Sequence, residues 1–175
     1  MGQAVKNKGK QGEGQSNLAR GLREGALYVF GTVAIYLAIS LGSYSELDPG
    51  WSHSGGGGEI SNSGGAAGAW FADVALFLLG FFAYLIPAAI AWSAYLIFRQ
   101  RDPEPETKLY WLALRWIGLL LTLCAGAGLA GLQFGGAFGE LPNGIGGGLG
   151  HLVSGLAGDT FGVGGGSLVL LGLLL

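Results

Sequence analysis

Long apolar runs separated by short polar stretches dominate this chain. The runs cover residues 26–44, 66–98, 109–134 and 161–175. A helix needs about 20 apolar residues to cross a hydrocarbon core about 30 Å thick. The pattern therefore predicts an all-α membrane protein with four transmembrane helices. The predicted spans are about 25–44, 72–98, 109–134 and 161–175, joined by outer loops 45–71 and 135–160 and an inner loop 99–108.

The run at 66–98 is longer than one crossing requires. If Arg99 marks the inner boundary, counting back about 20 to 25 residues leaves Asp73 in the outer interface, solvated or near a helix amino terminus. Pro87 then falls in the inner half of the span. Proline removes a backbone hydrogen bond, so we expect a kink there.

The ends of the chain differ from its centre. Residues 1–22 are rich in Gly, Gln, Lys and Asn, which predicts a disordered basic arm ahead of a membrane domain at 23–175. The last apolar run, 161–175, gives only about 22 Å of helix. We therefore expect the sequence to be an excerpt of a longer protein whose fourth helix continues toward the cytoplasm.

The second outer loop, 135–160, carries an apolar stripe at helical spacing among many glycines. The stripe comprises Ile145, Leu149, Leu152, Val153 and Leu156. It favours a short helix lying in the outer interface, with a flexible glycine linker as the alternative, because each interior glycine costs a helix nearly 1 kcal/mol.

Composition and charge agree with a membrane protein and give its orientation. Half of the residues are apolar and 11% are charged. All nine Lys and Arg residues lie in or beside the amino-terminal arm and the inner loop, whereas 45–71 and 135–160 have none. Cytoplasmic segments retain basic residues, so both termini are predicted to be cytoplasmic, facing anionic lipid headgroups. The predicted membrane anchors are Arg99, Arg101, Lys108, Arg115, Trp111 and Trp116.

Small residues form two faces on the third span, Gly126 with Ala130 and Ala127 with Gly131. Such faces let helices approach closely in lipid. They indicate packing within one subunit, with packing between subunits as the alternative.

The chain shows no catalytic, cofactor-binding or metal-binding pattern. It has no Walker A motif, no Cys and His pairs at metal-ligand spacing and no nucleophile elbow. Asp73, Pro87 and the glycine-rich loop suggest a second reading, a small multi-pass transporter or channel subunit. That reading is weakened because no second buried acid or base lies in any span to continue a proton relay.

Two strings and their surroundings resemble a known family. They are Asp48-Pro49-Gly50-Trp51-Ser52 and the stretch from Asn62 through Gly68 to Asp73, followed by Gly80 and Pro87. Together they resemble the amino-terminal four-helix membrane domain of FtsK-type DNA translocases. The stretch 53–61, with its four consecutive glycines, departs from the pattern as an unstructured insertion.

The resemblance implies a role within a larger machine. The full protein would be an ATP-driven DNA translocase, with ATP and Mg in a hexameric cytoplasmic motor absent here and DNA bound only by that motor. The membrane part would sit in the bacterial inner membrane at the division septum as anchor and scaffold, coupling chromosome segregation to division. Its partners would be lipid, other division proteins and further copies of itself. The motif residues expected to be structural or to contact partners are Asp48, Pro49, Trp51, Asn62, Gly68, Asp73 and Pro87.

Overall fold

The computed structural model describes residues 2–99, 105–134 and 143–175, and the regular structure of this part of the chain is helical. The elements are α1 (Gly2–Gly42), α2 (Gly65–Leu79), the 3-10 turn η1 (Gly80–Tyr84), α3 (Leu85–Arg99), α4 (Pro105–Phe134) and α5 (Gly147–Leu174). Within these residues four stretches are long and apolar enough to cross a membrane. The predicted all-α fold with four candidate spans is confirmed.

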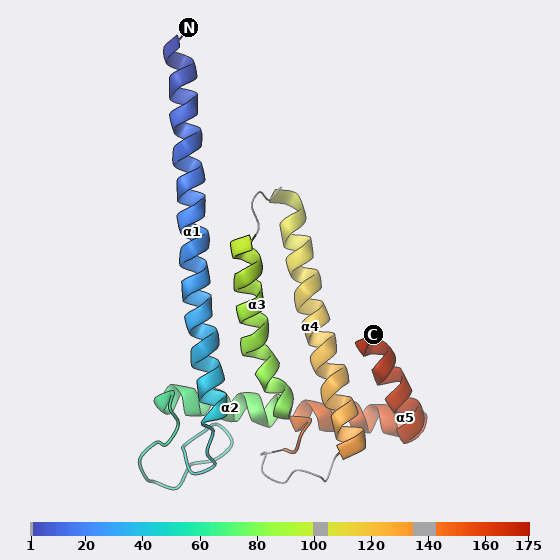
Figure 1. Ribbon diagram of the computed structural model, residues 1–175. Helices are drawn as coiled ribbons and strands as arrows, with labels where there is room; N and C mark the ends of the chain where they lie inside the picture. Colours follow the sequence, from blue (N-terminus) through green and yellow to red (C-terminus); the bar gives the residue numbers. More distant parts are fainter. Residues whose placement is uncertain (1, 100–104, 135–142) are drawn as a thin grey trace.

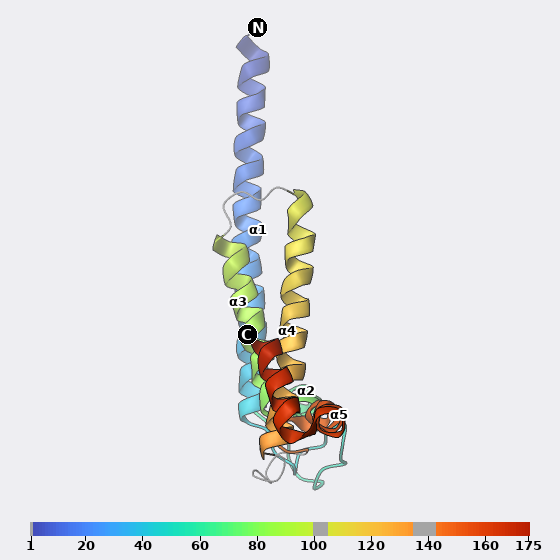
Figure 2. The same cartoon turned by 90° about the vertical axis from the view of Figure 1, so that its right-hand side faces the viewer.

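Upright and flat helices alternate along the chain. Figure 1 shows α1, α3 and α4 standing roughly parallel, with α2 and the first arm of α5 lying across their lower ends. The view at right angles places both flat segments at the end of the molecule opposite the amino terminus (Figure 2). Among the upright helices, α3 packs against α1, whereas α4 packs chiefly against α5.

The second apolar run is not one straight helix. It forms the flat helix α2, breaks at Gly80 and continues upward through η1 and α3. Gly80 has φ +56°, a conformation that costs other residues about 1–2 kcal/mol. The Phe81 N–H after the break donates to the Ile145 carbonyl at 2.9 Å, so the turn leaves this donor satisfied. The predicted span 72–98 lies within the candidate span Gly65–Arg99, which the structure divides into α2, η1 and α3.

Pro87 does not kink the span. It lies in the first turn of α3, where a helix has no partner for the N–H that proline lacks. From Gly80 to Arg99, η1 contributes about 10 Å and α3 about 22 Å, which together match a hydrocarbon core of about 30 Å. The apolar run 66–98 is longer than one crossing because its first part forms the flat helix α2.

The same design recurs in the second half of the chain. α5 begins as a flat arm and breaks at Gly162, whose φ is +70°, before its second arm rises (Figure 1). The helix expected in 135–160 is present from Gly147 onward, where the described residues favour it over the flexible linker. Gly64 and Gly146 precede the two flat helices, and the spacing from 64 to 80 equals that from 146 to 162. Each half is an upright helix, a flat helix, a glycine break and a second upright helix.

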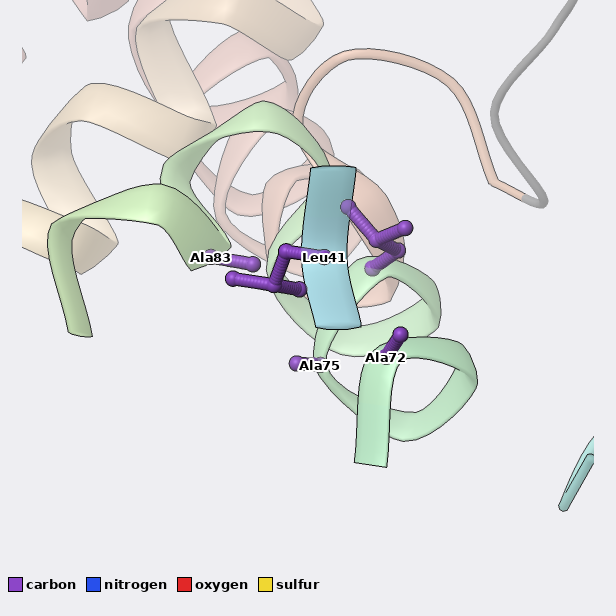
Figure 3. Packing of buried hydrophobic residues seen from close by; sticks show 5 residues of the cluster. Leu41, Ala72, Ala75 and Ala83 are labelled. Carbon is purple, nitrogen blue, oxygen red and sulfur yellow. The ribbon is translucent and has the colours of Figure 1, made fainter. Parts of the chain in front are cut away.

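Small side chains make the core where these helices meet. Leu41 of α1 inserts between Ala72 and Ala75 of α2 and Ala83 of η1, all of them buried (Figure 3). Lipid provides no hydrophobic drive between helices, so close van der Waals contact between small residues stabilises such packing.

In the other half, Ala125, Ala157 and Leu170 join α4 to both arms of α5. A Cβ on Gly131 would lie 2.9 Å from the Gly150 carbonyl oxygen. The face that Gly131 forms with Ala127 therefore packs within the chain.

The amino-terminal arm differs from the prediction. α1 continues through it to Gly2, where the composition predicted disorder for 1–22. A helix that is already nucleated in the apolar run can extend outward without a second nucleation cost, and the arm contains no proline to stop it.

Replacing Gly80 by alanine should destabilise the fold by about 2 kcal/mol or more, through the strained φ and a clash with the Ile145 carbonyl. The matched control is Gly118→Ala in α4, where an added Cβ meets open space and the change should be neutral or slightly stabilising. Thermal unfolding followed by tryptophan fluorescence in detergent compares the two. Equal melting temperatures for both variants would contradict the role given to Gly80.

Candidate functional site

The connection between α1 and α2, residues 43–64, is held by buried polar side chains; we call it the capping loop. Asp48 is 3% exposed, and its carboxylate accepts the backbone N–H groups of Ser61 at 2.7 Å and Asn62 at 2.8 Å. The Ser61 hydroxyl adds a contact of 3.1 Å to each oxygen. A carboxylate that accepts backbone N–H groups makes stronger hydrogen bonds than a neutral acceptor. Asp48 therefore closes the capping loop into a ring.

Asn62 joins the capping loop to both helices. Its amide nitrogen donates to the carbonyls of Ser40, at 2.8 Å, and Ser43, at 3.2 Å. Its amide oxygen accepts the Gly64 N–H at 2.8 Å. The last carbonyls of a helix lack partners within that helix, so Asn62 caps the end of α1 while fixing the start of α2.

Two glycines allow α2 to lie against α1 at this point. A Cβ on Gly68 would stand 2.6 Å from the Ser40 hydroxyl, and one on Gly64 would clash with the same atom. Ser40 is fully buried and donates to the Tyr36 carbonyl at 2.8 Å. The glycines at 64 and 68 are thus required by the close approach of the two backbones.

Asp73 forms a second buried centre, from the middle of α2. It is 1% exposed, and it accepts the backbone N–H of Ser52 at 2.6 Å and the Ser52 hydroxyl at 2.8 Å. The Tyr44 hydroxyl donates at 3.4 Å. Burial, with the negative charge of Asp73 as a second cause, raises the pKa of Tyr44 to about 12. Tyr44 therefore keeps its proton at neutral pH and serves Asp73 as a donor.

Ser52, His53 and Asp73 are the residue types of a hydrolytic triad, but their arrangement is different. Ser52 Oγ and His53 Nδ1 both face the same Asp73 oxygen, at 2.8 and 3.4 Å, and Nε2 of His53 is buried without a hydrogen-bond partner in the described structure. A triad needs the serine hydroxyl on one imidazole nitrogen and the carboxylate on the other. Among the described residues no group of three His, Cys, Asp or Glu side chains could hold a metal. The geometry is that of a structural cap.

Comparison with known families decides the identity. The model described as the 4TM region of DNA translocase FtsK/SpoIIIE matches residues 19–175. The chain belongs to this family. Four candidate spans and this membership make it a multi-pass inner-membrane protein of the FtsK type.

Curated relatives agree. The chain is 40% identical over 156 residues to the DNA translocase FtsK of Pseudomonas syringae pv. syringae, and 35% identical over 156 residues to that of Pseudomonas aeruginosa. Each alignment covers 88% of this chain and 19% of the relative. The Vibrio vulnificus DNA translocase FtsK is 35% identical over 162 residues, covering 91% of this chain and 16% of its own length. The chain thus spans about a fifth of the relatives it matches, and no solved structure matches it.

The FtsK-type motif residues fall into two groups in space. Asn62 and Gly68 lie against Ser40, and Asp48 joins this group through the Asn62 N–H. Trp51 and Asp73 lie beside Ser52. The Trp51 ring packs edge-on against Phe77 of α2, with centroids 5.2 Å apart. Pro49 lies where Gly55 folds back against it, and Pro87 stands apart, in α3.

The structure describes four of the six predicted membrane anchors. Arg99 ends α3, and its side chain is exposed, as are those of Trp111, Arg115 and Trp116 on α4. Arg101 and the Lys108 side chain lie outside the described residues.

Two expectations about this region are wrong. Asp73 was expected to be solvated or near a helix amino terminus, yet it is buried beneath the capping loop because Ser52 and Tyr44 supply its hydrogen bonds. The stretch 53–61 was expected to be an unstructured insertion, yet His53 contacts Asp73 and the Gly56 N–H donates to the Leu47 carbonyl at 2.8 Å. Of the four glycines in this stretch, only Gly57 and Gly58 have open space where a Cβ would lie.

Sequence reasoning missed Ser40, Ser52 and Ser61. Ser52 ends the first quoted string and Ser61 directly precedes the second, so their hydroxyls could have been recognised as partners for nearby carboxylates. Ser40 gave no signal, because a serine in an apolar run is also compatible with an internal bond to its own helix.

Replacing Asp48 by asparagine should loosen the capping loop, because one of its two acceptor oxygens becomes an NH₂ donor facing backbone donors. The loss of charge-assisted bonds costs about 2 kcal/mol, which corresponds to about thirtyfold faster hydrogen exchange at the amides of residues 61–64. Glu46→Gln, an exposed change of the same charge in the same loop, is the control and should leave exchange unchanged. Unchanged exchange in Asp48→Asn would refute the role given to Asp48.

Proposed function

We propose that this chain is the membrane anchor and division-site scaffold of a septal DNA translocase that couples chromosome segregation to cell division. The observation that carries the proposal is the family match over residues 19–175, since the matched relatives are named DNA translocases. The motor, with its ATP, Mg and DNA, would belong to the remainder of such a protein, and the chain itself would do no catalysis.

The positions of the basic residues support an orientation. Arg20 and Arg23 lie on α1 near the inner end of its candidate span, and Arg99 lies at the end of α3 that points the same way as the amino terminus (Figure 1). The capping loop and both flat helices lie at the other end, where no basic residue occurs in the sequence. Retention of basic residues in the cytoplasm would put both chain termini inside and the flat helices outside.

Anchoring has a mechanical and a kinetic consequence. A motor joined to the end of α5 is confined to the membrane, which raises its effective concentration wherever the anchor gathers. The pull of the motor on DNA would be borne by the spans, and the packing of α3 on α1 and of α4 on α5 gives them internal contacts that resist separation. Homo-oligomerisation, with a hexamer implied by the family, and contacts with other division proteins through the capping loop complete the proposal.

The transporter reading has lost its main support. It required Asp73 to serve as a relay group on a membrane crossing, whereas Asp73 lies on the flat helix α2 with its carboxylate turned to Ser52 of the capping loop. A carboxylate used as a hydrogen-bond anchor for a loop has a structural role.

A fluorescent protein that folds only in the cytoplasm tests orientation and site together. Fused after Leu175, it should fluoresce and form a band at the septum of dividing cells. Inserted between Gly57 and Gly58, where the chain has open space, it should stay dark because that point is outside. A dark fusion at Leu175 would contradict the orientation, and bright but evenly spread membrane fluorescence would contradict the division-site role.

A further inference from the structure

A cavity of about 240 Å³ lies between α3 and α4, away from the capping loop. Its walls come from both helices: Ala89, Trp92, Ser93, Arg115, Trp116 and Leu119. None of the family motif residues lines it. Ser93 precedes the end of α3 at Arg99 by less than two helical turns, so the cavity sits in the half of the spans toward the end that carries the basic residues.

Arg115 is the one charged group on this wall. It lies within the apolar candidate span Ala113–Phe134, near its start, and its side chain is exposed toward the surroundings of the protein. In the described part of the chain no carboxylate is within ion-pair distance of it. A charge at membrane depth is costly unless it reaches the interface or meets a counter-ion.

The other residues that line the cavity indicate which chemical groups the rest of the bound molecule would have. Ser93 adds a hydroxyl donor on the facing helix. The Trp92 and Trp116 indoles are 63% and 45% exposed, and such rings settle at the headgroup level of a bilayer. Ala89 and Leu119 make the rest of the surface apolar. The occupant must therefore carry an anionic group for Arg115 and apolar parts that leave sideways between two spans.

We propose that this cavity binds an anionic phospholipid, with Arg115 holding the phosphate and the two tryptophans flanking the glycerol and upper acyl chains. The planar guanidinium matches phosphate oxygens two at a time, and basic pockets between membrane helices are a known mode of headgroup recognition. The site would order lipid between α3 and α4, which otherwise pack mainly against α1 and α5 and not against each other. It requires neither the orientation nor the division role proposed above.

The test is quenching of tryptophan fluorescence in the 1–175 chain, purified in neutral detergent, by phosphatidylglycerol with brominated acyl chains. Arg115→Gln should weaken apparent affinity about tenfold. Arg99→Gln removes the same charge from the same end of the spans without touching the cavity and should change affinity less than about twofold. Brominated phosphatidylcholine should quench weakly and equally in all variants.

Three further arms keep the outcomes distinct. Ala89→Leu keeps every charge but fills the cavity, and it should also weaken phosphatidylglycerol binding, so the site is tested even if Arg115→Gln folds poorly. Excess inorganic phosphate should not release the lipid; release would mean a free-phosphate site and overturn the proposal. Equal losses in Arg115→Gln and Arg99→Gln, or no loss in Arg115→Gln and Ala89→Leu, would overturn it as well.

Discussion

Wherever this chain turns beside the membrane, its backbone N–H and carbonyl groups must find partners within the protein, because lipid offers none. The turn at Gly80 shows how this is met. The Phe81 N–H is taken by the Ile145 carbonyl, which belongs to the connection leading into α5. A Cβ on Gly147 would stand 2.5 Å from the Gly80 nitrogen, so only glycine permits the contact. This junction between α2 and α5 fixes the two halves of the molecule to each other.

The two halves reach the same shape with different chemistry. In the first half, side-chain hydrogen bonds hold the turn between the upright and the flat helix: Asp48 closes the capping loop and Asn62 caps α1. In the second, glycine backbones do so, with Gly146 and Gly150 packed directly on the Ala127 carbonyl of α4.

The sequence predicts the number of helices and their packing faces better than it predicts the bends and the long-range contacts. Four apolar runs, a helix in 135–160 and packing through small residues of α4 all followed from hydropathy and spacing. The flat position of α2 did not, because 66–98 is apolar throughout and Gly80 differs little from its neighbours in hydropathy. Pro87 was the obvious candidate for a bend, yet proline in a first helical turn bends nothing. Long-range partners such as Ser40 for Asn62 become visible only when the chain is folded.

The two buried acids of the motif could suggest either a functional site or a structural role. Asp48 and Asp73 are buried, as functional acids often are, but the hydrogen-bond donors to each carboxylate come from the capping loop itself. What the loop presents outward is its rim, with Trp51 and Leu47 56% and 74% exposed. The cap thus keeps Asp48 and Asp73 buried, and a partner would meet exposed side chains such as Trp51 and Leu47 and not these two carboxylates.

The flat arm of α5 offers the most direct test of the central claim, that two helices lie along the membrane surface at one end of the bundle. Spin labels would replace Leu152, Leu156 and Asp159, three exposed positions on one helical face, in a Cys124→Ala background. Relative accessibility to oxygen and to a water-soluble nickel complex in bilayers reports their depths. The account predicts one common depth for all three; a steady change totalling about 10 Å from 152 to 159, at about 1.5 Å per residue, would show a crossing helix and contradict it.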